Sequence, residues 1–233
     1  MTRQVGVLTA EPDRLLISQI AQAGLGFVVL DAEQTTLSAD RCADVVLALA
    51  GSGVEVSVRV PDLSPQTLVT YANTGVTELL LPQVRTLAEI EAAHQATRFP
   101  PAGTRSRQVS RASRYGTDFS GAPRIAVLVE TADAVEQAAS FAKSGLVDAA
   151  WFGPTDLADD VRINRPGSAS EVSELIDQAL GVFREHGVPV GLPAADAAGV
   201  AAAFARGADA CSVYWEKCLL SVLGGLAEAE ADR

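Results

Sequence analysis

Short runs of β-branched and aliphatic residues alternate along the chain with longer alanine-rich stretches whose apolar positions recur at helical spacing. Eight runs have the length and composition of buried strands, at 5–9, 27–31, 55–59, 78–82, 124–130, 149–152, 188–192 and 210–214. Apolar residues at helical spacing predict helices between and after these strands, near 12–23, 39–50, 64–74, 86–98, 132–144, 170–186, 194–206 and 216–230. This alternation is typical of βα units around a parallel sheet.

Eight strands and eight helices in 233 residues predict an α/β fold of the TIM (β/α)8 barrel type. A doubly wound open sheet is the alternative. Neither GxGxxG nor GxxxxGK[ST] opens a predicted helix, so the nucleotide-binding forms of that alternative have no support. Because no Gly-, Ser- or Pro-rich linker divides the chain into two cores, we expect one domain over residues 1–233.

The charge balance excludes several classes of partner. The chain carries 18 Lys and Arg against 29 Asp and Glu, a net charge of -11, whereas polyanion binding depends on clustered basic residues. We therefore expect no nucleic-acid or membrane partner, and the longest apolar run, 197–205, is too short to span a bilayer. The three cysteines, at 42, 211 and 218, form no CxxC pair and are odd in number, which favours reduced thiols and a cytoplasmic location.

One segment interrupts the βα rhythm. Residues 99–123 read FPPAGTRSRQVSRASRYGTDFSGAP, are rich in arginine and contain no clear strand. A loop of this length is functional, a subunit contact or a solvated connector. Because it follows a predicted helix, we expect it to begin on the face opposite the active site of a barrel.

Polar residues end several predicted strands, where a barrel places its catalytic groups. Glu33 and Arg59 are 26 residues apart, as are Glu130 and Asp156, which is about one βα unit. Each pair should therefore lie on neighbouring strands at the same height. Two carboxylates on adjacent strand ends, Glu130 and Asp156, form a hard oxygen-donor site suited to Mg²⁺ or Mn²⁺. The alternative is that both merely cap the helices that follow them.

Six segments of the chain together show a family resemblance. In order, they are GFVVLDAEQ, VRVP, ELLLPQV, PPAGTR followed by SRASRYG, VLVETADAV and WFGPTDLADD. They resemble the HpcH/HpaI aldolase family, the metal-dependent class II pyruvate aldolases. The resemblance covers about residues 5–220. It implies a TIM barrel that assembles as a homo-oligomer, a hexamer or trimer, with the C-terminal helix 216–230 exchanged between subunits. That helix carries an apolar stripe too extensive for a solvent-facing end, although packing on its own barrel is the alternative.

The resemblance also implies roles at matching positions. Glu130 and Asp156 would bind a divalent cation, Mg²⁺ first, with Mn²⁺ or Co²⁺ as alternatives, and a pyruvate-type 2-oxoacid substrate would chelate it. Arg59 would stabilise the enolate oxygen. Asp31 and Glu33 would orient the base and the metal's water. Backbone amides around the substrate-binding residues Gly153, Pro154 and Thr155 would hold the substrate carboxylate.

Three departures from the family pattern affect the chemistry. Gln34 stands where the family has the histidine of its proton-transfer dyad, Leu128 where it has a glutamine, and Asn73 where it has an aspartate. His94 and His186 are better interpreted as helix-surface residues, and Tyr115 or the arginines of the 99–123 loop are other candidates to replace the base. Because Gln34 cannot shuttle a proton, its presence favours enolisation or decarboxylation of a 2-oxoacid over aldol cleavage.

These observations predict a divalent-metal-dependent carbon–carbon lyase of the class II aldolase type. A Claisen-type or cyclising biosynthetic enzyme on the same platform is the alternative among enzymes. A catalytically silent barrel that binds an oxoacid or serves in assembly is the alternative of another class. Retention of Glu130, Asp156 and Arg59 favours an enzyme, because a scaffold does not need a metal site.

Overall fold

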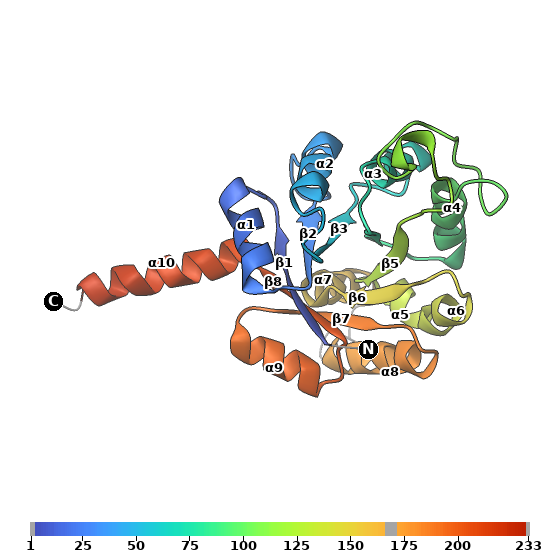
Figure 1. The fold of residues 1–233 in the computed structure, drawn as a ribbon. Helices are drawn as coiled ribbons and strands as arrows, with labels where there is room; N and C mark the ends of the chain where they lie inside the picture. The colour runs from blue at the N-terminus through green and yellow to red at the C-terminus, as the bar shows by residue number, and fades with distance from the viewer. Residues whose placement is uncertain (1–2, 166–171, 232–233) are drawn as a thin grey trace.

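A computed structural model of the protein describes residues 3–165 and 172–231 and contains a closed barrel of eight parallel strands (Figure 1). Each strand pairs with the next along the chain, and β8 closes the barrel against β1. The strands are β1 (Gln4–Thr9), β2 (Phe27–Asp31), β3 (Glu55–Arg59), β4 (Glu78–Leu81), β5 (Arg124–Val129), β6 (Ala149–Phe152), β7 (Val190–Ala194) and β8 (Ala210–Tyr214). The predicted TIM barrel is confirmed, with seven strands within one residue of their expected starts and β7 two residues later.

The helices surround the barrel and begin mostly where short polar side chains cap them. They are α1 (Arg14–Ala23), α2 (Ala39–Ala48), α3 (Pro65–Asn73), α4 (Leu87–Thr97), α5 (Ala132–Glu136), α6 (Ala138–Lys143), α7 (Pro154–Asn164), α8 (Val172–Glu185), α9 (Ala197–Ala205) and α10 (Trp215–Ala231). The capping box before α4 illustrates the local cause, because Thr86 accepts from the Glu89 amide while Glu89 accepts from the Thr86 amide.

Two helical predictions need correction. The stretch expected as one helix over 132–144 is divided at Gln137 into α5 and α6. The structure also contains α7, which the periodicity did not predict because only Leu157 and Val161 are buried along its 11 residues. Of the helix predicted over 170–186, residues 170 and 171 lie outside the described part of the chain.

The barrel interior is filled by side chains rather than open. Trp151 packs edge to face on Phe27, with ring centroids 5.5 Å apart. Two glycines make room for these rings: a Cβ on Gly191 would lie 2.3 Å from Trp151, and one on Gly6 would lie 2.4 Å from Phe27. Trp151 is therefore a core residue, as expected, and separates the two ends of the barrel.

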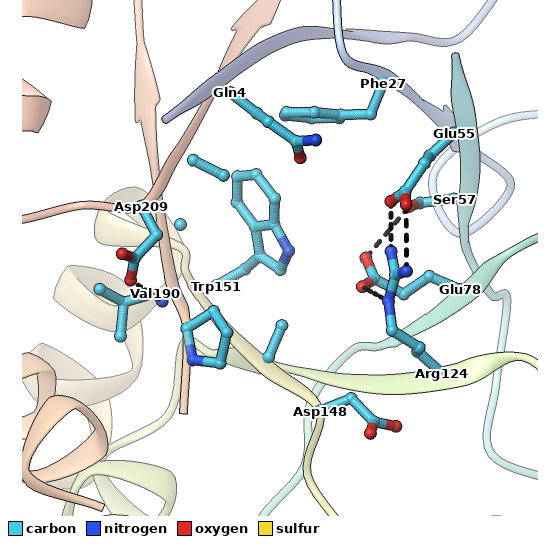
Figure 2. Close-up of a pocket in the computed structure, with 14 residues that line it drawn as sticks. Gln4, Phe27, Glu55, Ser57, Glu78, Arg124, Asp148, Trp151, Val190 and Asp209 are labelled. Carbon is cyan, nitrogen blue, oxygen red and sulfur yellow. Dashed lines mark hydrogen bonds and ion pairs between the residues drawn. The ribbon is translucent and has the colours of Figure 1, made fainter. Parts of the chain in front are cut away.

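A cavity of about 340 Å³ lies at the amino ends of the strands, and Trp151 is one of the residues that line it (Figure 2). On one wall the Arg124 guanidinium pairs with Glu55, at 2.5 Å from Nη2, and with Glu78, at 3.3 Å from Nε. Ser57 donates to the other oxygen of the buried Glu78. The network links neighbouring strands β3, β4 and β5, and we interpret it as a structural clamp on the end of the barrel opposite the active site.

The 99–123 segment forms a long connection that contains only one short 3₁₀ turn, at 114–116, and lies over α3 and α4 (Figure 1). It is held by Arg105, whose side chain is 1% exposed. The Arg105 guanidinium donates to Asn73 Oδ1 at 2.5 Å and stacks on Phe99, with 4.4 Å to the ring centroid. The unusual Asn73 thus anchors the loop within this chain.

Helix α10 leaves the barrel and extends away from it (Figure 1). Its first turn is fixed by Glu216, which accepts from Thr9 Oγ1 at 2.6 Å and from the Ala10 amide at 2.8 Å. Beyond that turn its large apolar side chains are exposed by 44–71%: Leu219, Leu220, Val222, Leu223 and Leu226. Across the described residues, no helix is both long and apolar enough to cross a membrane.

Candidate active site

A buried ion pair joins the ends of β2 and β3. Asp31 and Arg59 are register partners on these strands, which brings their side chains together. Arg59 donates to both Asp31 oxygens, from Nε at 2.9 Å and from Nη2 at 2.6 Å. Burial by itself lowers the pKa of Arg59, but the hydrogen bonds to Asp31 outweigh it and the net shift is upward. Arg59 therefore stays charged and its planar group is fixed in orientation.

Glu33 lies beside this pair and adds a second negative charge. Its Oε2 is 3.2 Å from Arg59 Nε, an ion pair without hydrogen-bond alignment, since the same atom has no hydrogen-bond partner in the described part of the chain. Burial raises the pKa of Glu33, and the charge of Arg59 opposes that effect. The hydrogen bonds of Asp31 in the described part of the chain thus engage it with Arg59 rather than with a histidine.

The carboxylate of Glu130 is held at the end of β5 by one residue that the sequence reasoning missed. The Gln83 backbone amide donates to Glu130 Oε1 at 2.8 Å, and the Gln83 side chain donates to the same oxygen at 3.0 Å. Gln83 reaches this geometry with φ of +53°, in the left-handed region. The hydrogen bonds of the described residues thus leave Glu130 Oε2 free.

Gly153 faces that free oxygen. A Cβ at Gly153 would lie 3.0 Å from Glu130 Oε2 and 2.9 Å from Glu130 Cβ, so only glycine leaves the carboxylate its position. Burial raises the pKa of Glu130 to about 7, and the nearby charges of Glu33 and Asp156 add to the shift. A buried, electrostatically crowded carboxylate of this kind is stabilised by a cation.

Asp156 was expected at a strand end, but it lies in the first turn of α7, after the end of β6. The N-terminus of α7 has no side-chain cap, and Pro154 at its first position has no amide hydrogen. The Gly153 amide donates to Val129 O. Of the residues expected to bind a carboxylate through backbone amides, only Thr155 therefore has a free N–H, followed by the amide of Asp156.

A cavity of about 450 Å³ opens at the carboxyl ends of the strands and collects these groups. Its polar lining comprises Arg59, Glu130, Thr155, Asp156, Ser212 and Tyr214, with Lys217 at the rim. Leu128, where the family has a glutamine, contributes to its apolar wall. The cavity has the size of a small-molecule site and lies where a TIM barrel carries its active site.

The donor set fits a hard divalent cation with open coordination positions. Within residues 3–165 and 172–231, no three His, Cys, Asp or Glu side chains form a metal-binding group. The free oxygen of Glu130 and the neighbouring Asp156 supply two carboxylates, and Mg²⁺ commonly binds one or two carboxylates and keeps waters or substrate oxygens at its other positions.

Gln34, at the position of the family's histidine, and the two histidines of the chain all lie outside the cavity lining. Gln34 is exposed and outside the cavity lining. His94 is on α4, and His186 is exposed after α8 with Nδ1 2.9 Å from Val182 O. Both histidines are surface or half-buried helix residues, consistent with our interpretation.

Two residues beyond the predicted set reach the site from β8 and α10. Tyr214 ends β8, and its hydroxyl oxygen is 3.3 Å from Arg59 Nη2. Lys217 Nζ lies 5.0 Å from the centroid of the Tyr214 ring. The rule that strand-end polar residues line the site identifies Tyr214 and Gln83 as well, once it is extended from charged residues to uncharged ones.

The chain is similar to known proteins along most of its length. A family model described as HpcH/HpaI aldolase/citrate lyase matches residues 4–215. A 5-keto-4-deoxy-D-glucarate aldolase from Escherichia coli O139:H28 is 30% identical over 198 residues, 81% of this chain and 77% of that protein.

Two solved structures share the fold. An HpcH/HpaI aldolase/citrate lyase family protein from Burkholderia cenocepacia J2315 superposes with a TM-score of 0.87 at 24% identity, covering 100% of this chain and 95% of that one. The CitE protein of Mycobacterium tuberculosis, in complex with magnesium and pyruvate, gives a TM-score of 0.58 at 18% identity, covering 93% and 87%.

Proposed function

The chain belongs to the HpcH/HpaI aldolase/citrate lyase family and is an enzyme of the aldolase and lyase kind, and we propose that it cleaves or forms carbon–carbon bonds of 2-oxoacids through a pyruvate-type enolate. The observation that carries the proposal is the arrangement of the cavity. A free carboxylate oxygen of Glu130, the carboxylate of Asp156 and the guanidinium of Arg59 all line one small space.

Glu130 and Asp156 would hold a divalent cation, Mg²⁺ being the best fit to two carboxylates, with Mn²⁺ or Co²⁺ as alternatives. When bound, the cation would polarise the substrate's keto group and offset the charge of the enolate. The CitE protein, whose structure shares the fold, is in complex with magnesium and pyruvate, which supports the choice of ion and substrate class.

The remaining steps are carried by side chains and amides of this chain. The uncapped N-terminus of α7 offers the Thr155 amide, supported by the helix dipole, to the substrate carboxylate. Arg59, held rigid by Asp31, places positive charge beside the developing enolate oxygen. Glu33 adds negative charge beside the Arg59 Nε atom and helps to keep the guanidinium in place.

Decarboxylation of a 2-oxo-diacid such as oxaloacetate suits this set better than aldol cleavage. Aldol cleavage needs a base for the hydroxyl proton, and Gln34 cannot serve as one. Cleavage of a carboxylate as carbon dioxide needs only enolate stabilisation. We therefore expect metal-dependent enolisation and decarboxylation to exceed retro-aldol activity on simple 4-hydroxy-2-oxoacids.

The test is metal-dependent turnover of oxaloacetate together with Mg²⁺ binding by calorimetry. Asp156→Ala should abolish both, because one carboxylate alone gives weak binding. Asp159→Ala on the same helix is the matched control, since Asp159 is exposed and, among the described residues, pairs only with Arg162. Unchanged Mg²⁺ affinity in Asp156→Ala would show that the metal site is wrong.

We also propose that α10 packs against a second copy of the chain, so that the enzyme is a homo-oligomer. Five large apolar residues on α10 are exposed, and the helix extends beyond its own barrel (Figure 1). Leu220→Lys with Leu223→Lys should shift the molar mass measured by light scattering towards the monomer.

We expect a cytoplasmic location, since all three cysteines are free thiols and two are buried.

A further inference from the structure

The cavity contains few groups that could donate a proton to carbon. Glu130 and Asp156 are assigned to the cation, and Arg59 is held by Asp31 and never gives up its proton. The hydroxyls of Thr155 and Ser212 are very weak acids. Among the described residues that line this cavity, Tyr214 and Lys217 remain as candidates for acid–base chemistry.

The hydrogen-bond geometry leaves the proton of Tyr214 available. Arg59 Nη2 lies 3.3 Å from the Tyr214 oxygen, and a guanidinium can only donate. The oxygen therefore accepts from Arg59, and its own hydrogen is free to point towards a ligand. In the described part of the chain, no hydrogen bond has Tyr214 as its donor, which is unusual for a half-buried phenol that lines a cavity.

Two cationic groups lie near the atom that would carry the negative charge after proton donation. A tyrosinate would lie beside the guanidinium of Arg59 and within reach of the Lys217 ammonium, which sits 5.0 Å from the ring centroid. Both positions are fixed by the fold. Tyr214 is paired in register with Leu8 of β1, and the first turn of α10 is held by Glu216.

Tyr214 is better suited to the role of donor than Lys217. Burial raises the pKa of Tyr214, and this effect outweighs the opposing charge of Arg59, so the phenol is protonated at neutral pH. Lys217 is exposed on α10, at the rim of the cavity, where water hydrates its ammonium. Its position favours a supporting electrostatic role.

We propose that Tyr214 is the catalytic acid that protonates the enolate carbon, an inference that rests on the proposed lyase function. When the carbon–carbon bond breaks, carbon dioxide leaves and the electron pair of the broken bond remains in the enolate. The Tyr214 O–H bond then breaks, the enolate electrons form a new C3–H bond, and the keto group of pyruvate is restored. The tyrosinate recovers its proton from solvent. Tyr214 thus supplies a proton-transfer group from β8 in a site where Gln34 cannot act.

The test separates bond cleavage from protonation during oxaloacetate turnover with Mg²⁺. Oxaloacetate loss reports cleavage, and coupled lactate dehydrogenase, which uses only the keto form, reports protonated pyruvate. In the unmodified enzyme both signals should advance together. In Tyr214→Phe, enzymatic protonation should slow by about 10²-fold or more, so enolpyruvate is released and pyruvate appears after a lag. Oxaloacetate loss itself should change much less.

Binding provides a readout that does not depend on turnover. Oxalate, which resembles the enolate, should bind Tyr214→Phe with Mg²⁺ about as tightly as the unmodified enzyme, measured by calorimetry. It should also perturb tyrosine absorbance in the unmodified enzyme but not in Tyr214→Phe. Tyr115→Phe is the matched control, because Tyr115 is 64% exposed in the 99–123 loop and should behave as the unmodified enzyme. Lys217→Met, at an exposed position, should give a shorter lag than Tyr214→Phe.

Each other result has a definite meaning. If Tyr214→Phe shows no lag, the donor is another group and the inference is wrong, while the proposed function stands. A lag in Lys217→Met alone would assign the donor to Lys217. If Tyr214→Phe loses oxalate affinity, its role is to support Arg59, and the inference is equally wrong. A lag in Tyr115→Phe instead would assign the donor to the loop. If the unmodified enzyme shows no metal-dependent loss of oxaloacetate, the proposed function fails and this inference fails with it.

Discussion

Adding one methyl group at Gly153 should displace the Glu130 carboxylate and weaken the metal site without any backbone strain. Gly153 has φ of -107° and ψ of 83°, so φ is negative, as alanine also prefers. The effect of Gly153→Ala is therefore steric. The new Cβ would lie 2.9 Å from Glu130 Cβ and 3.0 Å from Oε2.

The magnitude follows from these distances. Ordinary contacts between carbon atoms are about 3.5–4.0 Å, so Glu130 must move by roughly 0.6–1.1 Å. Glu130 Oε1 accepts two hydrogen bonds from Gln83, at 2.8 and 3.0 Å, and a shift of that size would stretch at least one of them. Overpacking a buried site typically costs about 1–3 kcal/mol, which for a domain of this size lowers the melting temperature by roughly 2–12 °C.

The assay combines thermal unfolding with calorimetric Mg²⁺ binding. Gly181→Ala is the matched control, because nothing lies within 4 Å of its new Cβ and the residue is inside α8. Replacing a helical glycine with alanine typically stabilises by about 0.5–1 kcal/mol, so the control should shift in the opposite direction. Mg²⁺ affinity should fall by about 10- to 100-fold in Gly153→Ala, the typical cost of disturbing the contacts that hold a metal ligand, and stay unchanged in Gly181→Ala.

The reasoning is refuted if Gly153→Ala binds Mg²⁺ as the unmodified protein does. It is also refuted if affinity falls equally in the two alanine variants, since only one of them contacts Glu130.

Three further predictions follow from buried charges. Asp31→Asn leaves the Arg59 guanidinium with Glu33 as its acidic partner, so the free energy of unfolding measured in urea titrations should fall by about 3 kcal/mol. Asp44→Asn, at an exposed position on α2, is the control. Equal losses in both variants would contradict the role of the pair. Because burial raises the pKa of Glu130 to about 7, a proton competes with the cation for this carboxylate. Mg²⁺ affinity should therefore rise between about pH 6 and 8, with proton release detectable by calorimetry in two buffers. An affinity independent of pH would contradict this. Burial also raises the pKa of Glu78 above its unfolded value, so its ionised form costs stability as pH rises. Glu78→Gln should therefore gain stability relative to the unmodified protein as pH rises above about 4, and a constant difference in urea titrations would contradict this.

Much of the barrel could be predicted from the sequence, because strand and helix periods are local properties. The runs that formed β2, β3 and β8 have the predicted limits. Register between consecutive strands also followed, since one βα unit returns the chain to the same height. The predicted equal height of Glu33 and Arg59 needs correction, because the register partner of Arg59 is Asp31, while Glu33 contacts Arg59 from beyond the end of β2. The closeness of Glu130 to Asp156 is a consequence of the repeat.

Helix α7 and the anchoring of the 99–123 loop could not be predicted in this way. Helix α7 buries only Leu157 and Val161, too few for a periodic signal, and begins at Pro154 where the strand ends. Arg105 is an ordinary polar residue in the sequence, yet it is buried on Phe99 and bonded to Asn73. Burial of a charged side chain depends on which surfaces meet around it.

The contacts of Gln83 and Tyr214 were decided only by the closed barrel. Gln83 meets Glu130 across 47 positions of sequence through a left-handed turn. Tyr214 meets Arg59 across 155 positions because β8 pairs with β1 and its end faces the same mouth as β3. The sequence by itself determined the strands, the helical rhythm and the charged residues at the strand ends. Which uncharged side chains join them is set by closure of the sheet, because hydrogen-bond partners distant in sequence are chosen by three-dimensional packing.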